Sequence, residues 1–248
     1  MGVFVSWSGG KDCCLACYRA IGNGLDVRYL ASMITEDTGR LWPHHLSPEV
    51  LSLQAQAIGI PIVQPRAKVA NYDDIFRNTL LAFKKEGITG GVFGDVSIGN
   101  NLAEKHHQWI DSVCQPIGIT PYLPLWNQSR ESLLRDFIES GFEAIIISAD
   151  NDQLGKEWLG RRVDRELLSE LKLRYELSPT GEVGYYHTFV IDGPLFKKRL
   201  EILKTDKVFT SGFWFLDIVE CRLKAKVSGN VVAITSQQPG TSTKGQGS

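Results

Sequence analysis

Ser6-Trp7-Ser8-Gly9-Gly10-Lys11-Asp12 follows an apolar run that begins at Val3 and precedes an apolar helical pattern over residues 13–20. This order predicts a buried strand that breaks into a glycine turn and then opens a helix. Glycine tolerates positive φ and lets the backbone approach a ligand closely. The amides of such a turn and of the helix N-terminus point to one spot, where they favour phosphate oxygens. The stretch therefore indicates a phosphate site.

Three side chains of this turn support the phosphate interpretation. Ser8 supplies a hydroxyl group and Lys11 a compact positive charge, while Asp12 either orders the loop or sits beside a magnesium ion held by the phosphates. The turn is not a Walker loop, because the Gly-x-x-x-x-Gly-Lys-Ser/Thr spacing is missing. An ordinary strand-to-helix turn is the alternative, and Gly-Gly alone would favour it. Lysine and aspartate directly after the glycines make nucleotide binding the stronger hypothesis.

The composition excludes several classes of function. The chain has 248 residues, enough for one large α/β domain or two small ones. Its formal net charge of -1 comes from 27 basic and 28 acidic residues, so bulk nucleic acid and acidic membranes are not expected partners. No apolar run is long enough to span a bilayer, and the chain begins directly with a strand. We expect a cytoplasmic protein without a membrane anchor.

Cysteine and histidine usage does not favour a metal centre. Five cysteines are an odd number for a disulfide framework. Three of them, at positions 13, 14 and 17, share the first helix and have no second Cys-x-x-Cys. Small buried thiols in a reducing compartment are therefore expected rather than a zinc site. Adjacent histidines, as at 44–45 and 106–107, rarely ligate one metal ion.

The first half of the chain alternates strands with helices. This alternation predicts a parallel sheet with helices on both faces. In such sheets ligands bind beyond the carboxyl ends of the strands. Gly10-Lys11 and Gly94-Asp95 both follow predicted strands, so we expect them to meet in one crevice. The predicted strands after the first are 27–35, 61–65 and 91–96, with an extended segment at 121–126, and the predicted helices are 48–58, 73–85 and 102–117.

After Trp126 the pattern becomes less regular, and a second domain is expected. It has predicted helices at 131–140 and 164–171, the second with Asp164 as its N-cap, and predicted strands at 143–149, 185–191, 208–210, 213–226 and 231–235. The tail over 236–248 has no apolar pattern and is predicted to be disordered. The sequence thus predicts domains over 1–126 and 127–235, the second smaller and of the α+β class.

A second informative stretch runs from Ser178 to Phe196. It places a glycine-bearing acidic loop before a strand that contains His187, Thr188 and Asp192. Thr188 and Asp192 share one face of that strand, and His187 points to the other. On the pattern alone, a bulged hairpin with a plain turn at 192–194 is favoured over a site.

A resemblance to known proteins favours a functional site over the plain hairpin. The turn SGGKD resembles the PP-loop of the N-type ATP pyrophosphatases, which split ATP into AMP and pyrophosphate. Together with later segments, it resembles the diphthine–ammonia ligase family of PP-loop ATPases over residues 3–220. Those segments are, in order, Gly94-Asp95-Val96, Pro124-Leu125-Trp126, Gly141-Phe142-Glu143-Ala144-Ile145-Ile146, Trp158-Leu159-Gly160, Gly181-Glu182, His187-Thr188-Phe189-Val190 and Asp192-Gly193-Pro194-Leu195-Phe196.

The resemblance implies a fold and a reaction. The fold is a Rossmann-like PP-loop domain, of the adenine nucleotide alpha hydrolase-like type, followed by a smaller substrate-binding α+β domain. In the reaction, ATP adenylates the carboxylate of diphthine, a modified histidine on translation elongation factor 2, and ammonia then displaces AMP. A free carboxylate does not react with amines at neutral pH, so the site must neutralise pyrophosphate, exclude water and align the amine.

The resemblance also implies roles for residues of this chain. ATP binding is expected from Ser6, Ser8, Gly9, Gly10, Lys11, Asp12, Gly94 and Asp95. Mg²⁺ is expected at Asp12 and Asp95. The catalytic candidates are Lys11, Asp12, Glu182, Thr188 and Asp192, and the substrate candidates are Gly181, Glu182, Tyr185 and His187. The loop with His44-His45 is expected near the nucleotide, while Trp7 is expected to pack in the core.

The chain departs from the family pattern in its acidic loop. Val183 stands where the family has a small residue, Tyr185 replaces a second glutamate, and His187 replaces the usual glutamate before the threonine. These features, with Phe213-Trp214-Phe215-Leu216-Asp217, look more like bacterial paralogues. Bacteria lack diphthamide, so a different carboxylate is expected as the substrate, with ammonia or another amine as the nucleophile.

Two other functions stay open at this point. The first is a PP-loop tRNA-modifying enzyme, against which the near-neutral charge and the missing second Cys-x-x-Cys both count. The second is an ATP-binding sensor that has lost catalysis, which Val183 and Tyr185 would allow. The sequence also leaves the oligomeric state open, a homodimer included.

Overall fold

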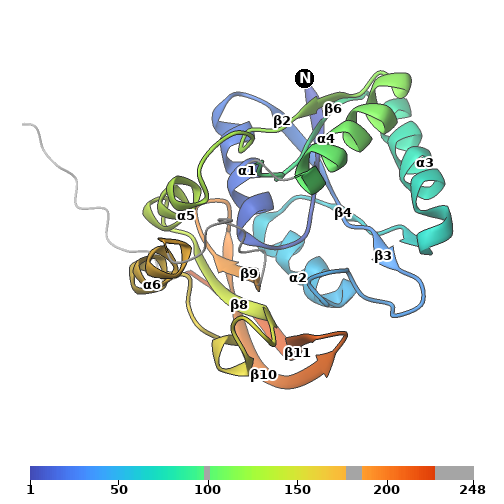
Figure 1. The fold of residues 1–248 in the computed structure, drawn as a ribbon. Coiled ribbons are helices and arrows are strands. Elements are labelled where there is room, and N and C mark those ends of the chain that lie inside the picture. Colours follow the sequence, from blue (N-terminus) through green and yellow to red (C-terminus); the bar gives the residue numbers. More distant parts are fainter. Residues whose placement is uncertain (98–100, 177–185, 227–248) are drawn as a thin grey trace, which may run out of the picture.

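The computed structural model describes residues 1–97, 101–176 and 186–226 (Figure 1). Its first half contains a five-stranded, wholly parallel sheet in the order β4-β2-β1-β6-β7. This confirms the predicted parallel α/β fold. The strands are β1 (Gly2–Ser6), β2 (Asp26–Ala31), β4 (Ile62–Val63), β6 (Ile88–Val92) and β7 (Thr120–Tyr122). A separate parallel pair consists of β3 (Ile34–Thr35) and β5 (Arg66–Ala67).

Helices cover both faces of this sheet. Successive side chains of β1 point to opposite faces, so Val3 and Val5 enter one apolar cluster and Phe4 another. The Val3 side holds α1 (Lys11–Gly22) and α2 (Pro48–Ile58). The Phe4 side holds α3 (Tyr72–Lys85) and α4 (Asn101–Cys114), which lie together in Figure 1. The central strand is thus buried on both faces.

Helix α2 begins and ends where its sequence predicts. The Ser47 hydroxyl accepts a 3.3 Å hydrogen bond from the Val50 amide, and Pro48 occupies the first turn, where its missing N–H is no loss. Gly59 ends the helix in the left-handed region at φ 84°. This placement matters because α2 carries Gln54, a residue of the site described below.

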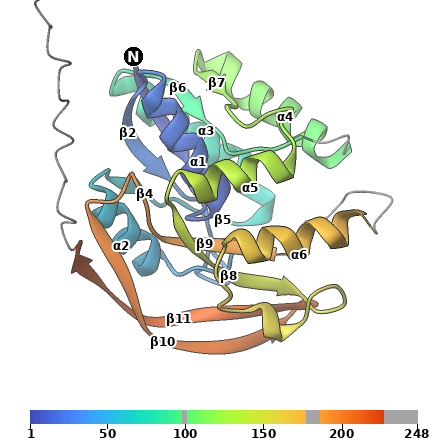
Figure 2. The same cartoon turned by 90° about the vertical axis from the view of Figure 1, so that its left-hand side faces the viewer.

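The second half forms an antiparallel sheet in the order β10-β11-β8-β9. Its strands are β8 (Glu143–Asp150), β9 (Tyr186–Asp192), β10 (Lys198–Thr210) and β11 (Phe213–Ala225). Two helices, α5 (Arg130–Glu139) and α6 (Arg165–Glu176), lie side by side in Figures 1 and 2. Asp164 caps α6 as predicted, because its Oδ1 accepts from the Leu167 amide at 2.9 Å.

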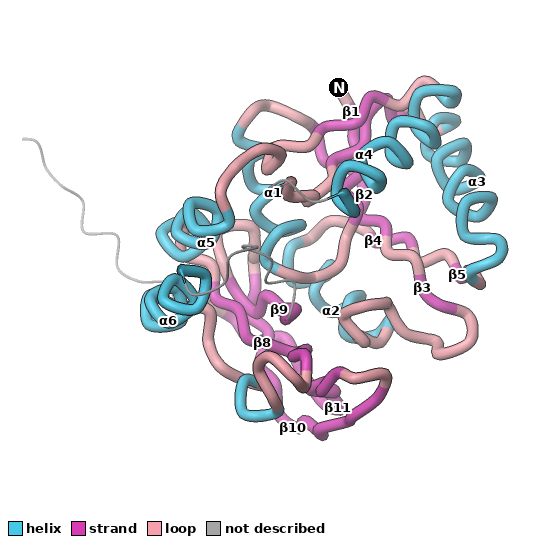
Figure 3. Tube along the Cα trace, in the orientation of Figure 1, coloured by secondary structure: helices cyan, strands magenta, loops and turns pink. Residues whose placement is uncertain are grey.

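The two sheets share one apolar core. The cluster that contains Val3 and Val5 continues through α1 and α2 to β8, β9 and β11 of the second sheet. Helix α2 contacts β10 and β11, and α1 contacts β9. Figure 3 shows α1 and α2 between the parallel sheet and the strands of the second sheet. Strand β9 therefore lies against the turn that follows β1.

Several predicted boundaries are wrong. The strand predicted at 91–96 is β6, which begins at Ile88 and ends at Val92, so Gly94-Asp95 lies in the loop after it. The helix predicted at 102–117 ends at Cys114, where a 3-10 turn, η2 (Gln115–Ile117), begins with Pro116 in it. The strand predicted at 208–210 is the end of the 13-residue β10. The strand predicted at 231–235 and the tail at 236–248 lie outside the described residues.

None of the helices in the described ranges combines the length and the apolar character that crossing a membrane requires.

Candidate active site

The predicted phosphate turn opens into a pocket of about 360 Å³ at the carboxyl ends of β1 and β6. Both halves of the chain contribute to it. Its lining residues are Ser6, Ser8, Gly10, Lys11, Asp12, Cys13, Pro43, His44, Gly94, Asp95, His106, Tyr186, His187 and Thr188. The predicted convergence of Gly10-Lys11 with Gly94-Asp95 is therefore present.

A buried glutamine, Gln54, holds the turn in position. Gln54 Nε2 donates to the Gly9 carbonyl at 3.0 Å and to the Val190 carbonyl at 2.8 Å. Gln54 Oε1 accepts from Trp7 Nε1 at 2.8 Å, and Trp7 is 2% exposed. The Gly9 carbonyl also accepts from the Val190 amide at 2.9 Å. Trp7 is thus a core residue, as predicted, and Gln54 ties the turn to both α2 and β9.

Close contacts favour glycine at both positions of the turn. Gly9 has φ 76°, and a Cβ atom there would lie 2.8 Å from Gln54 Oε1. A Cβ atom at Gly10 would lie 3.0 Å from the Thr188 carbonyl and 3.1 Å from His44 Nε2. Larger residues would therefore displace the walls of the pocket.

Strand β9 contacts the N-terminus of α1. The Lys11 amide donates to the Thr188 hydroxyl at 3.0 Å, and Thr188 is 3% exposed. One of the free amides at the start of α1 is therefore already satisfied by the second half of the chain. This contact fixes the position of β9 relative to the phosphate turn.

The charges of the pocket occur as two pairs. Lys11 Nζ lies 2.7 Å from Asp12 Oδ2 and 5.5 Å from the centre of the Tyr186 ring. His106 Nδ1 lies 2.5 Å from Asp95 Oδ1, and this hydrogen bond raises the pKa of His106. Each candidate magnesium ligand therefore has a basic partner. Among the described residues, no three His, Cys, Asp or Glu side chains gather closely enough to form a metal site by themselves.

Gly94 lets the loop after β6 touch the beginning of α1. A Cβ atom at Gly94 would lie 2.9 Å from the Asp12 carbonyl carbon and 2.9 Å from the Cys13 nitrogen. Only a residue without a side chain permits this approach. The contact brings Asp95 to the same pocket as Asp12.

Some predicted site residues lie elsewhere. Asp192 does not line this pocket; its carboxylate lies 2.7 Å from Lys226 Nζ and 3.6 Å from Arg199 Nη1, and it accepts from the Gly193 amide. Gly181, Glu182 and Tyr185 lie outside the described residues. Of the site residues predicted on the acidic loop and the strand after it, the structure thus brings His187 and Thr188 to the pocket.

The sequence predicts no site role for Gln54, His106 or Tyr186, and for His44 it predicts only a loop near the nucleotide. The ring of His44 lies 4.5 Å from the ring of His187, between centroids. Burial, and then the charge of Lys11, lowers the pKa of His187 to about 4. The pKa of His44 is also well below its usual range, because of burial, His187 and Lys11. Both imidazoles are therefore neutral at neutral pH.

The loop that carries His44 is anchored on β11. Arg40 makes a two-pronged ion pair with Asp217, at 2.7 and 2.9 Å, and donates to the His45 carbonyl at 2.9 Å. The His45 ring stacks on Phe215 at 4.7 Å between centroids. These contacts hold His44 at the pocket from outside the parallel sheet.

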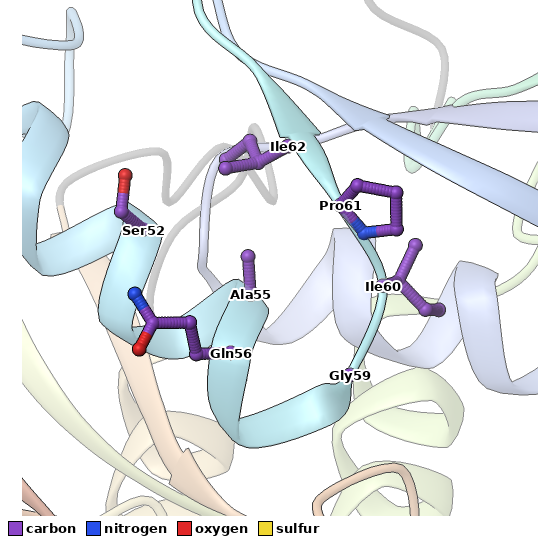
Figure 4. Close-up of a pocket in the computed structure, with 7 residues that line it drawn as sticks. All are labelled: Ser52, Ala55, Gln56, Gly59, Ile60, Pro61 and Ile62. Atoms are coloured by element: carbon purple, nitrogen blue, oxygen red, sulfur yellow. The ribbon is translucent and has the colours of Figure 1, made fainter.

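A second hollow, of about 400 Å³, lies between the end of α2 and β4 (Figure 4). It is lined by Ser52, Ala55, Gln56, Gly59, Ile60, Pro61 and Ile62. These residues include no ionisable side chain and no predicted site residue. This hollow therefore offers no charged or acid–base group.

Comparison with known proteins agrees with this arrangement. Residues 1–121 match the family model of the diphthamide synthase N-terminal domain, and residues 129–224 match that of the C-terminal domain. The chain is 30% identical to the diphthine–ammonia ligase of Rattus norvegicus, over 87% of this chain and 88% of the relative. It is 26% identical to that of Homo sapiens, over 89% and 92%.

Two further matches are more limited, one in the share of the relative that it covers and the other in its structural similarity. The diphthine–ammonia ligase of Schizosaccharomyces pombe is 30% identical over 81% of this chain but only 35% of its own length. A solved structure described as a predicted subunit of a tRNA methyltransferase from Methanocaldococcus jannaschii aligns with 78% of this chain and 98% of its own, at a TM-score of 0.43 and 16% identity. The family models and the long matches to the ligases agree: the chain belongs to the diphthine–ammonia ligase family of PP-loop ATP-dependent ligases.

Proposed function

We propose that this chain is an AMP-forming ligase that activates a carboxylate with ATP for attack by ammonia or another amine. The observation that carries the proposal is the single pocket that unites the glycine turn, Lys11 and the Gly94-Asp95 loop with Thr188 from the second sheet. Family membership supports the reaction class.

The residues of the turn would hold the phosphates. The Gly10 backbone and the Ser8 hydroxyl line the pocket and would offer hydrogen-bond donors, and Lys11 offers a charge that is shared with Asp12. ATP supplies the adenylyl group that turns a carboxylate oxygen into part of a good leaving group. Lys11 would then stabilise the negative charge that develops on the departing pyrophosphate.

Asp12 and Asp95 would contact a magnesium ion. Their oxygen atoms are the ligand type that Mg²⁺ takes, and both line the pocket. Each carboxylate has one basic partner, and no three His, Cys, Asp or Glu side chains of the described residues gather as a metal site, so phosphate oxygens would complete the coordination. The ion would therefore bind together with the nucleotide.

We assign residues 1–126 to ATP binding and residues 127–235 to the carboxylate substrate. Thr188 would position β9 at the phosphate turn, and His187 would face the reacting groups. Glu182, with Gly181 and Tyr185, remains a candidate for handling the substrate or ammonia. Asp192 is the least supported catalytic candidate, because Lys226 and Arg199 already compensate its charge.

We propose that the protein acts in the cytoplasm. We further propose that it is a relative of the bacterial paralogues and that its acid differs from diphthine. Val183, Tyr185 and His187 support this, since the family's second glutamate is absent. A missing carboxylate removes an anchor for ammonium or for the trimethylammonium group of diphthine. An aromatic ring at Tyr185 would attract a cation more weakly than a carboxylate does, since a cation–π contact contributes only about 0.5–2 kcal/mol.

Product analysis tests the reaction class. The protein is incubated with ATP, Mg²⁺, ammonium and a panel of carboxylates that includes diphthine-bearing elongation factor 2, and nucleotides are separated by chromatography. We expect AMP and pyrophosphate in equal amounts with an accepted acid. ADP and orthophosphate as the products would contradict an AMP-forming mechanism.

A further inference from the structure

A wall of two histidines faces the phosphate turn. His44 reaches the pocket from the loop before α2, and His187 reaches it from β9. Their rings lie 4.5 Å apart, and His44 Nε2 lies 3.1 Å from the point that a Cβ atom on Gly10 would occupy. The imidazoles therefore border the same space as the backbone that we assign to phosphate binding.

One nitrogen of this wall has no partner. Nδ1 of His44 is shielded from solvent and makes no hydrogen bond in the structure. Buried polar atoms in folded proteins are nearly always hydrogen-bonded, so this exception calls for an explanation such as a functional role of the ring. The ion pair between Arg40 and Asp217 anchors the loop, so the His44 ring is held in a fixed position.

We propose that His44 and His187 are phosphate-binding residues, which together take up one proton from solvent and donate a hydrogen bond to an oxygen of bound pyrophosphate or triphosphate. This inference rests on the proposed phosphate site. It adds two titratable side chains to the phosphate site at the glycine turn.

Electrostatics gives the reason for proton uptake. Burial and then the positive charge of Lys11 keep the His187 ring neutral, while Asp12 opposes this effect. Burial, the neighbouring His187 and Lys11 keep the His44 ring neutral. The uncharged Tyr186 hydroxyphenyl ring lines the pocket beside them, and Arg40, His45 and Asp217 surround the base of the loop. A polyanion at the turn would offset the charge of Lys11 and favour an imidazolium. Two rings at 4.5 Å repel each other when both are charged, so one proton is expected.

Calorimetry with inorganic pyrophosphate tests the proposal on the full chain. Titrations at pH 7 in two buffers of different ionisation enthalpy give the number of protons taken up on binding. His44→Gln and His187→Gln keep a hydrogen-bonding side chain but do not titrate, and the double variant removes both sites. His107→Gln is the control, because His107 packs on Trp126 and does not line the pocket.

We expect the double variant to take up about one proton fewer than the wild type and the His107 control, since the ionisation of pyrophosphate itself cancels in the difference. His44→Phe, which removes the hydrogen bond, should bind about tenfold more weakly. Wild-type affinity should rise more steeply as pH falls from about 8 to about 6 than that of the double variant, given the ordinary histidine pKa.

Equal proton uptake and equal affinity in the wild type and the double variant would overturn the inference while leaving the phosphate site in place. A wild type that binds pyrophosphate with no proton difference between buffers, after correction for the ligand, would overturn it without any variant. Absence of pyrophosphate binding to the wild type would instead remove the phosphate site and the proposed function with it.

Discussion

Replacing Gln54 by leucine should destabilise the phosphate turn. Gln54 is fully buried and makes three hydrogen bonds, to the Trp7 indole and to the Gly9 and Val190 carbonyls. The leucine has a similar size, so the loss is mainly polar. The Trp7 N–H is left without this acceptor inside the core, and the two carbonyls lose a donor.

The size of the effect follows from those three bonds. A buried donor left unpaired costs about 1–3 kcal/mol and each lost carbonyl bond about 0.5–1.5 kcal/mol, so Gln54→Leu should lower the free energy of unfolding by about 2–6 kcal/mol. Gln56→Leu is the matched control, since Gln56 lies two residues along the same helix and is exposed. Its effect should stay within about 0.5 kcal/mol.

Urea unfolding followed by circular dichroism measures both variants. ATP affinity, measured in the folded range, should also fall for Gln54→Leu, because the Gly9 carbonyl keeps only its bond from the Val190 amide. The reasoning is refuted if Gln54→Leu is no less stable than Gln56→Leu.

Two further predictions concern pH and substrate. Because the folded-state pKa of His187 is lowered to about 4, the stability that its neutral form confers is present above the ordinary histidine pKa of about 6.5 and is lost as pH falls from there toward about 4. Unfolding of His187→Gln across pH 4–7 should therefore show a shallower acid loss than the wild type, and identical slopes would count against the buried neutral imidazole. In cells that lack their diphthine–ammonia ligase, this chain should restore little diphthamide, scored by mass spectrometry of elongation factor 2; full restoration would mean that Val183 and Tyr185 do not change the substrate.

The sequence predicted the parallel half well because its local signals agree with its tertiary role. The helix over 48–58 has a serine cap, a proline in its first turn and a terminal glycine, and the structure has it at the same bounds. The strand at the start is apolar on both faces because helices cover both. The meeting of Gly10 and Gly94 followed from the general geometry of parallel sheets.

Strand β10 was mostly missed for a physical reason. It is an edge strand, and from Lys204 to its end both faces are exposed, so no alternation of apolar and polar residues marks it. Its pairing with β11 supplies the strand conformation instead. Charged edge strands of this kind carry little local signal.

The site was predicted less completely than the fold. Local pattern predicted Lys11 and Asp12, next to the glycines, as site residues, and both line the pocket. Gln54 and His44 act through contacts that join distant segments, and no spacing in the chain indicates these contacts. Tertiary packing alone brings His44 to the pocket and Gln54 to the Gly9 carbonyl of the turn.

Titration of ATP into the wild type and Lys11→Ala tests the central claim most directly. Lys11 lines the pocket and is 21% exposed, and its removal both deletes a charge-assisted contact and leaves Asp12 unpaired next to the phosphates. We expect binding to weaken by about 1.5–3 kcal/mol, whereas Lys85→Ala, in the last turn of α3, should bind ATP as the wild type does. Equal affinities of Lys11→Ala and the wild type would contradict the assignment of the glycine turn as the phosphate site.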